Sequence, residues 1–254
     1  MPSIDLNCDL GEAKTEASLA VETRVMPFLT SVNVACGFHA GTADTMRKTI
    51  RSARTHGLAI GAHPGFLDRE GFGRRAMHLT PSEVETLVAY QVGALSGLAA
   101  LEGARLTHVK PHGALYNLAA QDSALADAIV RAVAAVDRRL VLVALAGSVC
   151  VTSARALGLT VAEEAFADRA YSQSGTLMPR DLPGAVISDA HEALDRAIRL
   201  VQEGTLPAFD GSTIRVHADT ICLHGDTPNA EVLARTLREG LERAGVVIAP
   251  LTHE

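Results

Sequence analysis

Thr107-His108-Val109-Lys110-Pro111-His112-Gly113 is the stretch that decides the fold of this chain. A short apolar run that suits a β-strand ends abruptly in an ammonium and an imidazole, and a glycine follows. A buried strand has no need of such residues, whereas the carboxyl ends of parallel strands face the crevice where α/β proteins bind ligands. The stretch therefore predicts a parallel strand that delivers functional side chains to one edge of a sheet.

The same pattern recurs along the whole sequence. Seven short apolar runs are predicted strands, with 246–249 as a late addition: 4–7, 32–35, 59–61, 107–110, 140–146, 160–165 and 220–224. Periodicity and capping residues predict helices between them: 42–55, 80–102, 122–136, 148–157, 189–202 and 229–244. Residues 166–187 read as one long loop, of the kind that is often functional.

Alternating strands and helices over the full length predict a parallel sheet with crossover helices. No linker or charge block divides the sequence, so residues 1–254 are predicted to form a single domain. Nearly every predicted strand ends in polar residues, and this even spread favours a closed barrel over an open sheet with one switch point. We therefore predict an α/β fold, an irregular (β/α) barrel of about seven strands.

Composition argues against several classes of protein. The 29 acidic and 23 basic side chains give a formal net charge of −6 without a lysine cluster, which disfavours a nucleic-acid partner. No uninterrupted apolar run approaches the ~18 residues of a membrane span, and the first residues lack the segments of an export signal. The four cysteines form no CxxC pair, so reduced thiols are expected. We expect a cytoplasmic protein with no nucleic-acid or membrane partner.

Four of the ten histidines follow predicted strands beside a glycine or proline: His39, His63, His112 and His224. Any one of them is readily explained as a buried histidine bonded to a neighbouring backbone group. Four at one edge of a sheet favour a functional role.

Two aspartates come from opposite ends of the sequence. Asp9 and Asp226 become neighbours if a barrel closes between its first and last strands. Paired acids and Asp–His pairs supply general acid/base catalysis. Asp226 is equally well explained as a cap for the helix that begins near residue 229.

Asp9, His39 and His63 together could form an Asp-His-His metal site with open positions for water. No HExxH or CxxC spacing supports this site, so it depends on the convergence of the strand ends. Lys110 is either a clamp for an oxyanion or a phosphate, or an ion-pair partner within the barrel.

Residues 71–75, Gly-Phe-Gly-Arg-Arg, form a predicted loop with two guanidinium groups. Arg74 and Arg75 suit a bidentate grip on a carboxylate or phosphate, although an ordinary solvated turn has the same composition. The sequence contains neither a GxxxxGK[ST] loop nor a GxGxxG motif after a strand, so it predicts no self-contained nucleotide site.

Seven blocks of the sequence resemble the LamB/YcsF family. They are DLNCDLGE (5–12), NVACGFHAG (33–41), IGAHPGF (60–66), GFGRR (71–75), VKPHGALYN (109–117), EAFADRAY (164–171) and CLHGDTP (222–228). The blocks run from the first strand to the last helix. Phe66 departs from the tyrosine expected in many relatives, which leaves the resemblance intact.

The resemblance implies a barrel similar to that of the glycoside hydrolase/deacetylase superfamily. The family includes the A subunit of the prokaryotic ATP-dependent 5-oxoprolinase, which works with subunits B and C and opens 5-oxoproline to L-glutamate. ATP is then expected to bind with or on the partner subunits, and a divalent metal is compatible with the site. The alternatives are a stand-alone metal-dependent deacetylase-like amide hydrolase and a non-catalytic substrate-binding subunit.

For the ring-opening reaction we expect Asp9 or His63 to act as general base. Lys110 and His112 are expected to stabilise developing negative charge, and His224 or Asp226 to protonate the departing nitrogen. The predicted substrate-binding residues are Asn7, Arg74, Arg75, Glu164 and Arg169.

Overall fold

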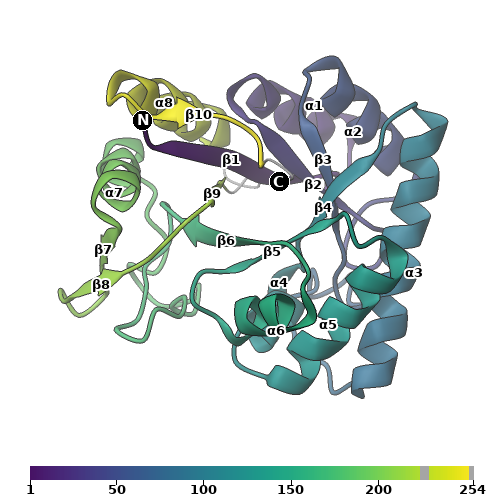
Figure 1. Ribbon diagram of the computed structural model, residues 1–254. Coiled ribbons are helices and arrows are strands. Elements are labelled where there is room, and N and C mark those ends of the chain that lie inside the picture. Colours follow the sequence, from purple (N-terminus) through teal and green to yellow (C-terminus); the bar gives the residue numbers. More distant parts are fainter. Residues whose placement is uncertain (224–228, 252–254) are drawn as a thin grey trace.

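The computed structural model describes residues 1–223 and 229–251 (Figure 1). Seven parallel strands form a closed barrel: β1 (Ser3–Leu10), β2 (Ser31–Ala35), β3 (Ala59–His63), β4 (Leu106–Val109), β5 (Val141–Leu145), β6 (Val161–Phe166) and β9 (Thr220–Leu223). Each strand pairs with the next one of this series, and β9 pairs back with β1. The short β10 (Val247–Ile248) adds to the first residues of β1. The predicted seven-stranded barrel is confirmed.

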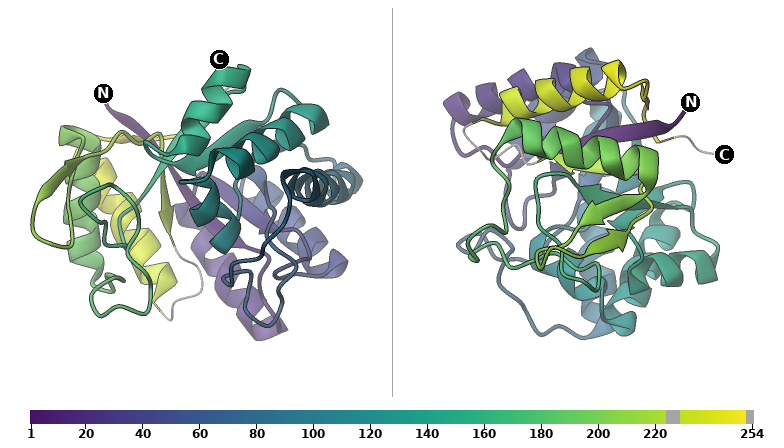
Figure 2. Two further views of the ribbon diagram at one scale, coloured as in Figure 1. Left: turned by 90° about the horizontal axis from the view of Figure 1, so that it is seen from below. Right: turned by 90° about the vertical axis from the view of Figure 1, so that its left-hand side faces the viewer.

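Helices lie on the outside of the barrel (Figures 1 and 2). Six of them match the predicted ones: α2 (Ala43–Thr55), α3 (Pro81–Leu101), α5 (Ser123–Val136), α6 (Val149–Leu157), α7 (Ala190–Glu203) and α8 (Ala230–Arg243). Five further elements were not predicted: α1 (Glu16–Val25), the 3-10 turn η1 (Met26–Phe28), α4 (Gly113–Ala119) and the antiparallel strands β7 (Thr205–Pro207) and β8 (Thr213–Arg215).

Each unpredicted element lacks a strong local signal. Only Glu22 and Val25 of α1 are buried, so its sequence carries no apolar stripe. α4 has seven residues and begins at a glycine, both of which argue against a helix. β7 and β8 have three residues each, too few for a period of two to be visible.

α3 is the one helix of the described residues that is long and apolar enough, by length and composition, to cross a membrane. Its mean hydropathy is high enough for a span, but small and polar residues such as Gly93 and Ser96 interrupt its apolar residues, so the helix contains no uninterrupted apolar run of that length. α3 buries Val88, Val92 and Leu95 and packs along α5. A core-facing helix of a barrel passes the same test, so this helix is weak support for a membrane span.

The interior of the barrel is polar, unlike the branched apolar layers usual in such folds. Along β1, Leu6 belongs to the apolar core, whereas the neighbouring Asn7 is buried within a hydrogen-bond network. The Asn7 amide donates to Glu164 Oε1 (3.0 Å) and Thr220 Oγ1 (2.7 Å) and accepts from Asn33 Nδ2 (2.7 Å). His108 Nε2 lies 2.8 Å from Asn33 Oδ1. Strands therefore contact one another through inward polar side chains as well as through their backbones.

Gly61 of β3 tests how tightly this interior is packed. A Cβ at Gly61 would overlap the His108 ring, so Gly61→Ala should destabilise the protein by about 2–3 kcal/mol through overpacking and loss of the bond to Asn33. Gly97→Ala makes the same change on α3, where the new Cβ meets nothing within 4 Å. That control should be neutral or stabilising by up to about 1 kcal/mol. Urea unfolding measures both, and equal effects would contradict the packing described.

Candidate active site

A cavity of about 480 Å³ lies at the carboxyl ends of the barrel strands. Its walls include Asp9 at the end of β1, His63 at the end of β3, Lys110 and His112 after β4, and Arg169 after β6. Among the described residues, the polar strand ends therefore converge on one cavity, as the sequence predicts. His224 and Asp226, two of the predicted catalytic residues, lie outside the described residues.

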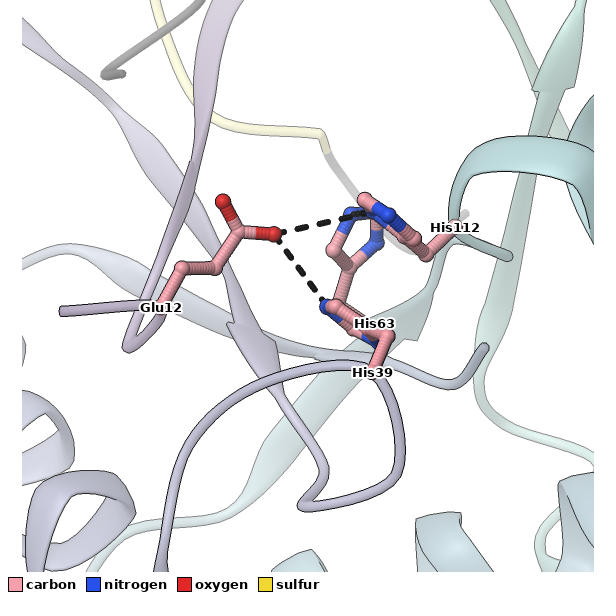
Figure 3. Close-up of side chains that lie close together, drawn as sticks. All are labelled: Glu12, His39, His63 and His112. Atoms are coloured by element: carbon pink, nitrogen blue, oxygen red, sulfur yellow. Dashed lines mark hydrogen bonds and ion pairs between the residues drawn. The ribbon is translucent and has the colours of Figure 1, made fainter. Parts of the chain in front are cut away.

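Three histidines and one glutamate gather beside this cavity (Figure 3). The side-chain nitrogen and oxygen atoms that Glu12, His39, His63 and His112 offer all lie within 4.8 Å of one another. Glu12 Oε1 is 3.2 Å from His39 Nε2 and 3.6 Å from His112 Nδ1, and His63 Nε2 is 3.0 Å from His112 Nδ1. We call these four residues the His/Glu cluster.

In two of these histidines, the outer ring nitrogen, which is the one directed away from the cluster, lies beside a backbone carbonyl. His63 Nδ1 lies 2.7 Å from the Lys110 carbonyl, and His112 Nε2 lies 2.8 Å from the Phe72 carbonyl. Because a carbonyl can only accept, both outer nitrogens carry their hydrogens. When such a ring is neutral, its inner nitrogen is unprotonated and can accept a hydrogen bond or a metal ion, and the inner nitrogens of His63 and His112 lie 3.0 Å apart.

Electrostatics keep the cluster rich in acceptors. Burial, with His63 nearby, lowers the pKa of His39 well below its usual value, and burial with the neighbouring rings likewise lowers the pKa of His112. Neutral imidazoles beside a carboxylate form the donor set of zinc-type metals, and outer nitrogens bonded to carbonyls are the usual second layer of such sites. The residues of the His/Glu cluster therefore fit a divalent metal.

The segments around the cluster hold its side chains in place. Phe72 adopts a left-handed backbone (φ 56°) that a non-glycine residue rarely takes, and its carbonyl accepts from His112. A Cβ at Gly73 would come within 2.8 Å of His39 and His112. On the other side, the buried Glu22 carboxylate accepts from the backbone N–H groups of Gly11 (2.7 Å) and Glu12 (3.1 Å). Glu22 thereby fixes the turn that aims Glu12 at the histidines.

The metal prediction from sequence named Asp9 with His39 and His63. In the structure, Glu12 and His112 complete the group around these two histidines, and Asp9 lies alongside with Oδ2 3.2 Å from His63 Nε2. Sequence reasoning did not single out Glu12, although its position three residues after Asp9 at a strand end was a usable signal. Glu22 and Phe72 had no such signal, because their roles arise only when the turns fold back.

Lys110 is buried between acceptors. Its ammonium donates to Asp9 Oδ1 (3.0 Å), Glu164 Oε1 (2.9 Å) and Cys222 Sγ (2.9 Å). Burial would lower the pKa of Lys110, but Asp9, Cys222 and Glu164 raise it well above its usual value. These three contacts engage all three of its protons, so the geometry favours the ion-pair role over that of a substrate clamp.

Asp9 is the partner of Lys110 that reaches the cavity. Burial would raise the pKa of its carboxyl, but the His63 ring and the Lys110 ammonium hold that pKa well below its usual value. Asp9 is therefore an ionised carboxylate on a cavity wall, next to an imidazole, as a general base requires.

The predicted substrate-binding residues divide into two groups. Arg74 and Arg169 line the cavity. Arg75 instead pairs with Asp68, and its side chain is 62% exposed. Asn7 and Glu164 lie in the polar interior of the barrel rather than on the cavity wall. Their contact with Lys110 connects them to Asp9.

Comparisons with known proteins agree with this architecture. Residues 4–254 match the model of the LamB/YcsF family. A protein of Bordetella pertussis, named as the A subunit of 5-oxoprolinase, is 53% identical over 247 residues, which cover 97% of this chain and 98% of the relative. The crystal structure of a lactam utilization protein from Thermus thermophilus has a TM-score of 0.92 at 48% identity, covering 98% of this chain and 100% of that one.

A more distant structure shares the fold alone. A family 4 carbohydrate esterase from Streptomyces lividans has a TM-score of 0.53 at 8% identity, covering 99% of this chain and 93% of the esterase. This likeness confirms the expected barrel of the deacetylase type.

The position of Lys110 leads to a stability prediction. Lys110→Met would leave Asp9 and Glu164 buried without their cation, so we expect a loss of about 3–5 kcal/mol in urea unfolding. Lys48→Met removes a lysine that pairs with Glu16 and Asp44 on the surface, and should leave the unfolding midpoint close to wild type. A wild-type midpoint for Lys110→Met would show that the buried carboxylates do not depend on this ammonium.

Proposed function

Because the chain belongs to the LamB/YcsF family, we propose that it acts as the A subunit of an ATP-dependent 5-oxoprolinase and opens 5-oxoproline to L-glutamate. The names of relatives at about half identity over nearly the full length support this proposal. The observation that carries it is the pairing of an ionised Asp9 with His63 on a cavity wall beside the His/Glu cluster. A carboxylate beside an imidazole, with a cluster that fits a metal, is an arrangement that amide hydrolases use.

The assembly follows from the chemistry of the substrate. A five-membered lactam is an unreactive amide, and its hydrolysis has little driving force of its own. The sequence contains no phosphate-binding loop, so we place ATP on the partner subunits B and C. We propose that they transfer the γ-phosphoryl group to the lactam oxygen, which yields ADP and a cyclic O-phosphoryl imidate.

Ring opening then takes place on this chain in two hydrolytic steps. Water adds to the activated carbon, the carbon–nitrogen bond breaks, and the nitrogen leaves as an amine to give a γ-glutamyl phosphate. A second water releases phosphate and L-glutamate. Asp9 takes the proton of the attacking water, because Lys110 and His63 keep its carboxylate ionised. His224 or Asp226 is proposed to protonate the departing nitrogen.

A divalent metal fits this scheme. Glu12, His39, His63 and His112 would hold it, and the bound metal supplies Lewis acidity toward an oxygen of the substrate or water. Lys110 holds Asp9 at the edge of the cluster, and Arg74, on the same cavity wall as His112, is proposed to receive the substrate carboxylate.

We propose that residues 1–254 act as a single domain, in keeping with one family model over 4–254 and a barrel that closes β9 on β1. A cytoplasmic location is supported by four free, buried cysteines. Subunits B and C are the proposed partners. The Bordetella relative is named as one subunit of an enzyme, and this name supports such an assembly.

The catalytic roles can be tested in the assembled enzyme. Asp9→Asn and His63→Ala should each abolish glutamate formation, while ATP hydrolysis driven by the partner subunits continues. His191→Ala, on the exposed face of α7, is the matched control and should retain wild-type turnover. Normal glutamate formation by both site variants would favour a purely substrate-binding role. Activity of the chain alone on N-acetyl substrates without ATP would favour the deacetylase-like hydrolase.

The metal proposal has a readout independent of turnover. The metal-free chain should bind about one Co²⁺ per molecule, with the visible spectrum of a site containing imidazole ligands. Glu12→Gln and His112→Ala should each weaken binding by about tenfold or more, and His191→Ala should leave it unchanged. Affinity that is equal in all four proteins would place the metal elsewhere.

A further inference from the structure

The cavity wall opposite the His/Glu cluster carries an unusual pair of arginines. The cluster comes from the ends of β1 to β4, while Arg169 and Arg180 belong to the segment after β6. β6 is three strands from β3 in one direction around the barrel and four in the other, so this segment stands across the barrel from His63. The cavity therefore has a side that carries the His/Glu cluster and an opposite side that carries Arg169 and Arg180.

Arg169 is a buried guanidinium, with 5% of its surface exposed. Its side chain donates to backbone carbonyls, from Nε to Ala185 (3.3 Å) and from Nη2 to Met178 (2.6 Å). Burial and the charge of Arg180 lower the pKa of Arg169 to about 10, and both side chains line the same cavity. Within residues 1–223 and 229–251, neither of them forms an ion pair, whereas Arg75 and Arg155 on the surface both do.

Arg169 and the backbone around it are held in place by hydrogen bonds. Arg196 of α7 donates to the carbonyls of Ala167 (3.2 Å) and Arg169 (2.9 Å). The Tyr171 hydroxyl accepts from the backbone of Phe166 at 2.8 Å, and Arg169 pairs with Val186 in an isolated bridge. A fixed, buried cation that forms no ion pair with a described carboxylate is costly unless an anion from outside completes the site.

Charge and volume indicate which anion. A ring as small as 5-oxoproline occupies only part of a cavity of about 480 Å³. Its single carboxylate already has a candidate partner in Arg74. Two further guanidinium groups match a dianion with several oxygens. Thr176 and the acidic Asp181 line the same cavity.

We infer that Arg169 and Arg180 form a subsite for the phosphoryl group of an O-phosphorylated substrate, separate from the group that holds the substrate carboxylate. This inference rests on the proposed function, since that function supplies the phosphoryl group. The subsite neutralises the phosphate while the carbon that bears it faces Asp9 and the His/Glu cluster. After ring opening, it holds the acyl phosphate in place for the second water.

Inorganic phosphate is the probe, and titration calorimetry on the isolated chain is the measurement. Wild type should bind phosphate, and Arg180→Ala should weaken that binding by about tenfold or more, because Arg180 makes no hydrogen bond or ion pair with a described residue and its loss should leave the fold intact. Arg75→Ala removes a surface arginine that pairs with Asp68, and should keep wild-type affinity. Arg169→Lys keeps the charge but loses the fork, and should also weaken phosphate binding.

A second arm distinguishes phosphate from carboxylate. Arg74→Ala should weaken the binding of 5-oxoproline but leave phosphate affinity within about twofold, because the carboxylate and the phosphoryl group occupy separate subsites. Loss of 5-oxoproline binding in Arg180→Ala, with normal binding in Arg74→Ala, would overturn the inference and make the arginines the carboxylate anchor. Absence of phosphate binding, or equal effects of Arg180→Ala and Arg75→Ala, would also overturn it. Phosphate binding that depends on Arg180, without glutamate formation in the assembled system, would instead overturn the proposed function alone.

Discussion

The contact on which the rest of the site depends is that of Lys110 with Asp9 and Glu164 inside the barrel. Two buried carboxylates would otherwise take up protons or destabilise the fold, because the charged form is poorly solvated there. The His63 ring and this ammonium hold the pKa of Asp9 well below its usual value, and Glu164 accepts from Asn7, which connects the contact to β1, β2 and β9. An ionised base at the cavity is thus a property of the whole barrel interior.

The His/Glu cluster shows the complementary arrangement. There burial lowers the pKa of His39 and His112, and the outer nitrogens of His63 and His112 are committed to backbone carbonyls, so the inner nitrogens are left to face a ligand. When both rings are neutral, the inner nitrogens of His63 and His112 are two acceptors 3.0 Å apart, which is unfavourable without a proton or a cation between them. The left-handed backbone of Phe72 adds to that cost, and such local strain is common where a site is built for a ligand.

Much of this was visible in the sequence, and the reason is periodicity. The apolar runs and the polar residues that end them are local patterns, so the barrel, six helices and the convergence of His39, His63 and His112 could be predicted. Glu22 could not, because its carboxylate bonds the Gly11–Glu12 turn only after the chain has folded back to bring α1 beside that turn. Arg180 was overlooked because it lies in a long loop without periodicity, and the start of this loop is bonded at the Arg169 carbonyl by Arg196, in a helix further along the chain.

The alternation along β1 couples the stability of the fold to the chemistry of the site. Leu6 and Leu10 pack in the apolar core, while Asn7 reaches the polar interior and Asp9 the cavity. A slip of one residue against β2 or β9 would exchange the two sets, placing Asp9 in the core and leucines among the polar groups. The contacts of Lys110 with the carboxylates and the position of Asp9 beside the His/Glu cluster would then be lost together. The register that buries the core is therefore the same register that positions the base.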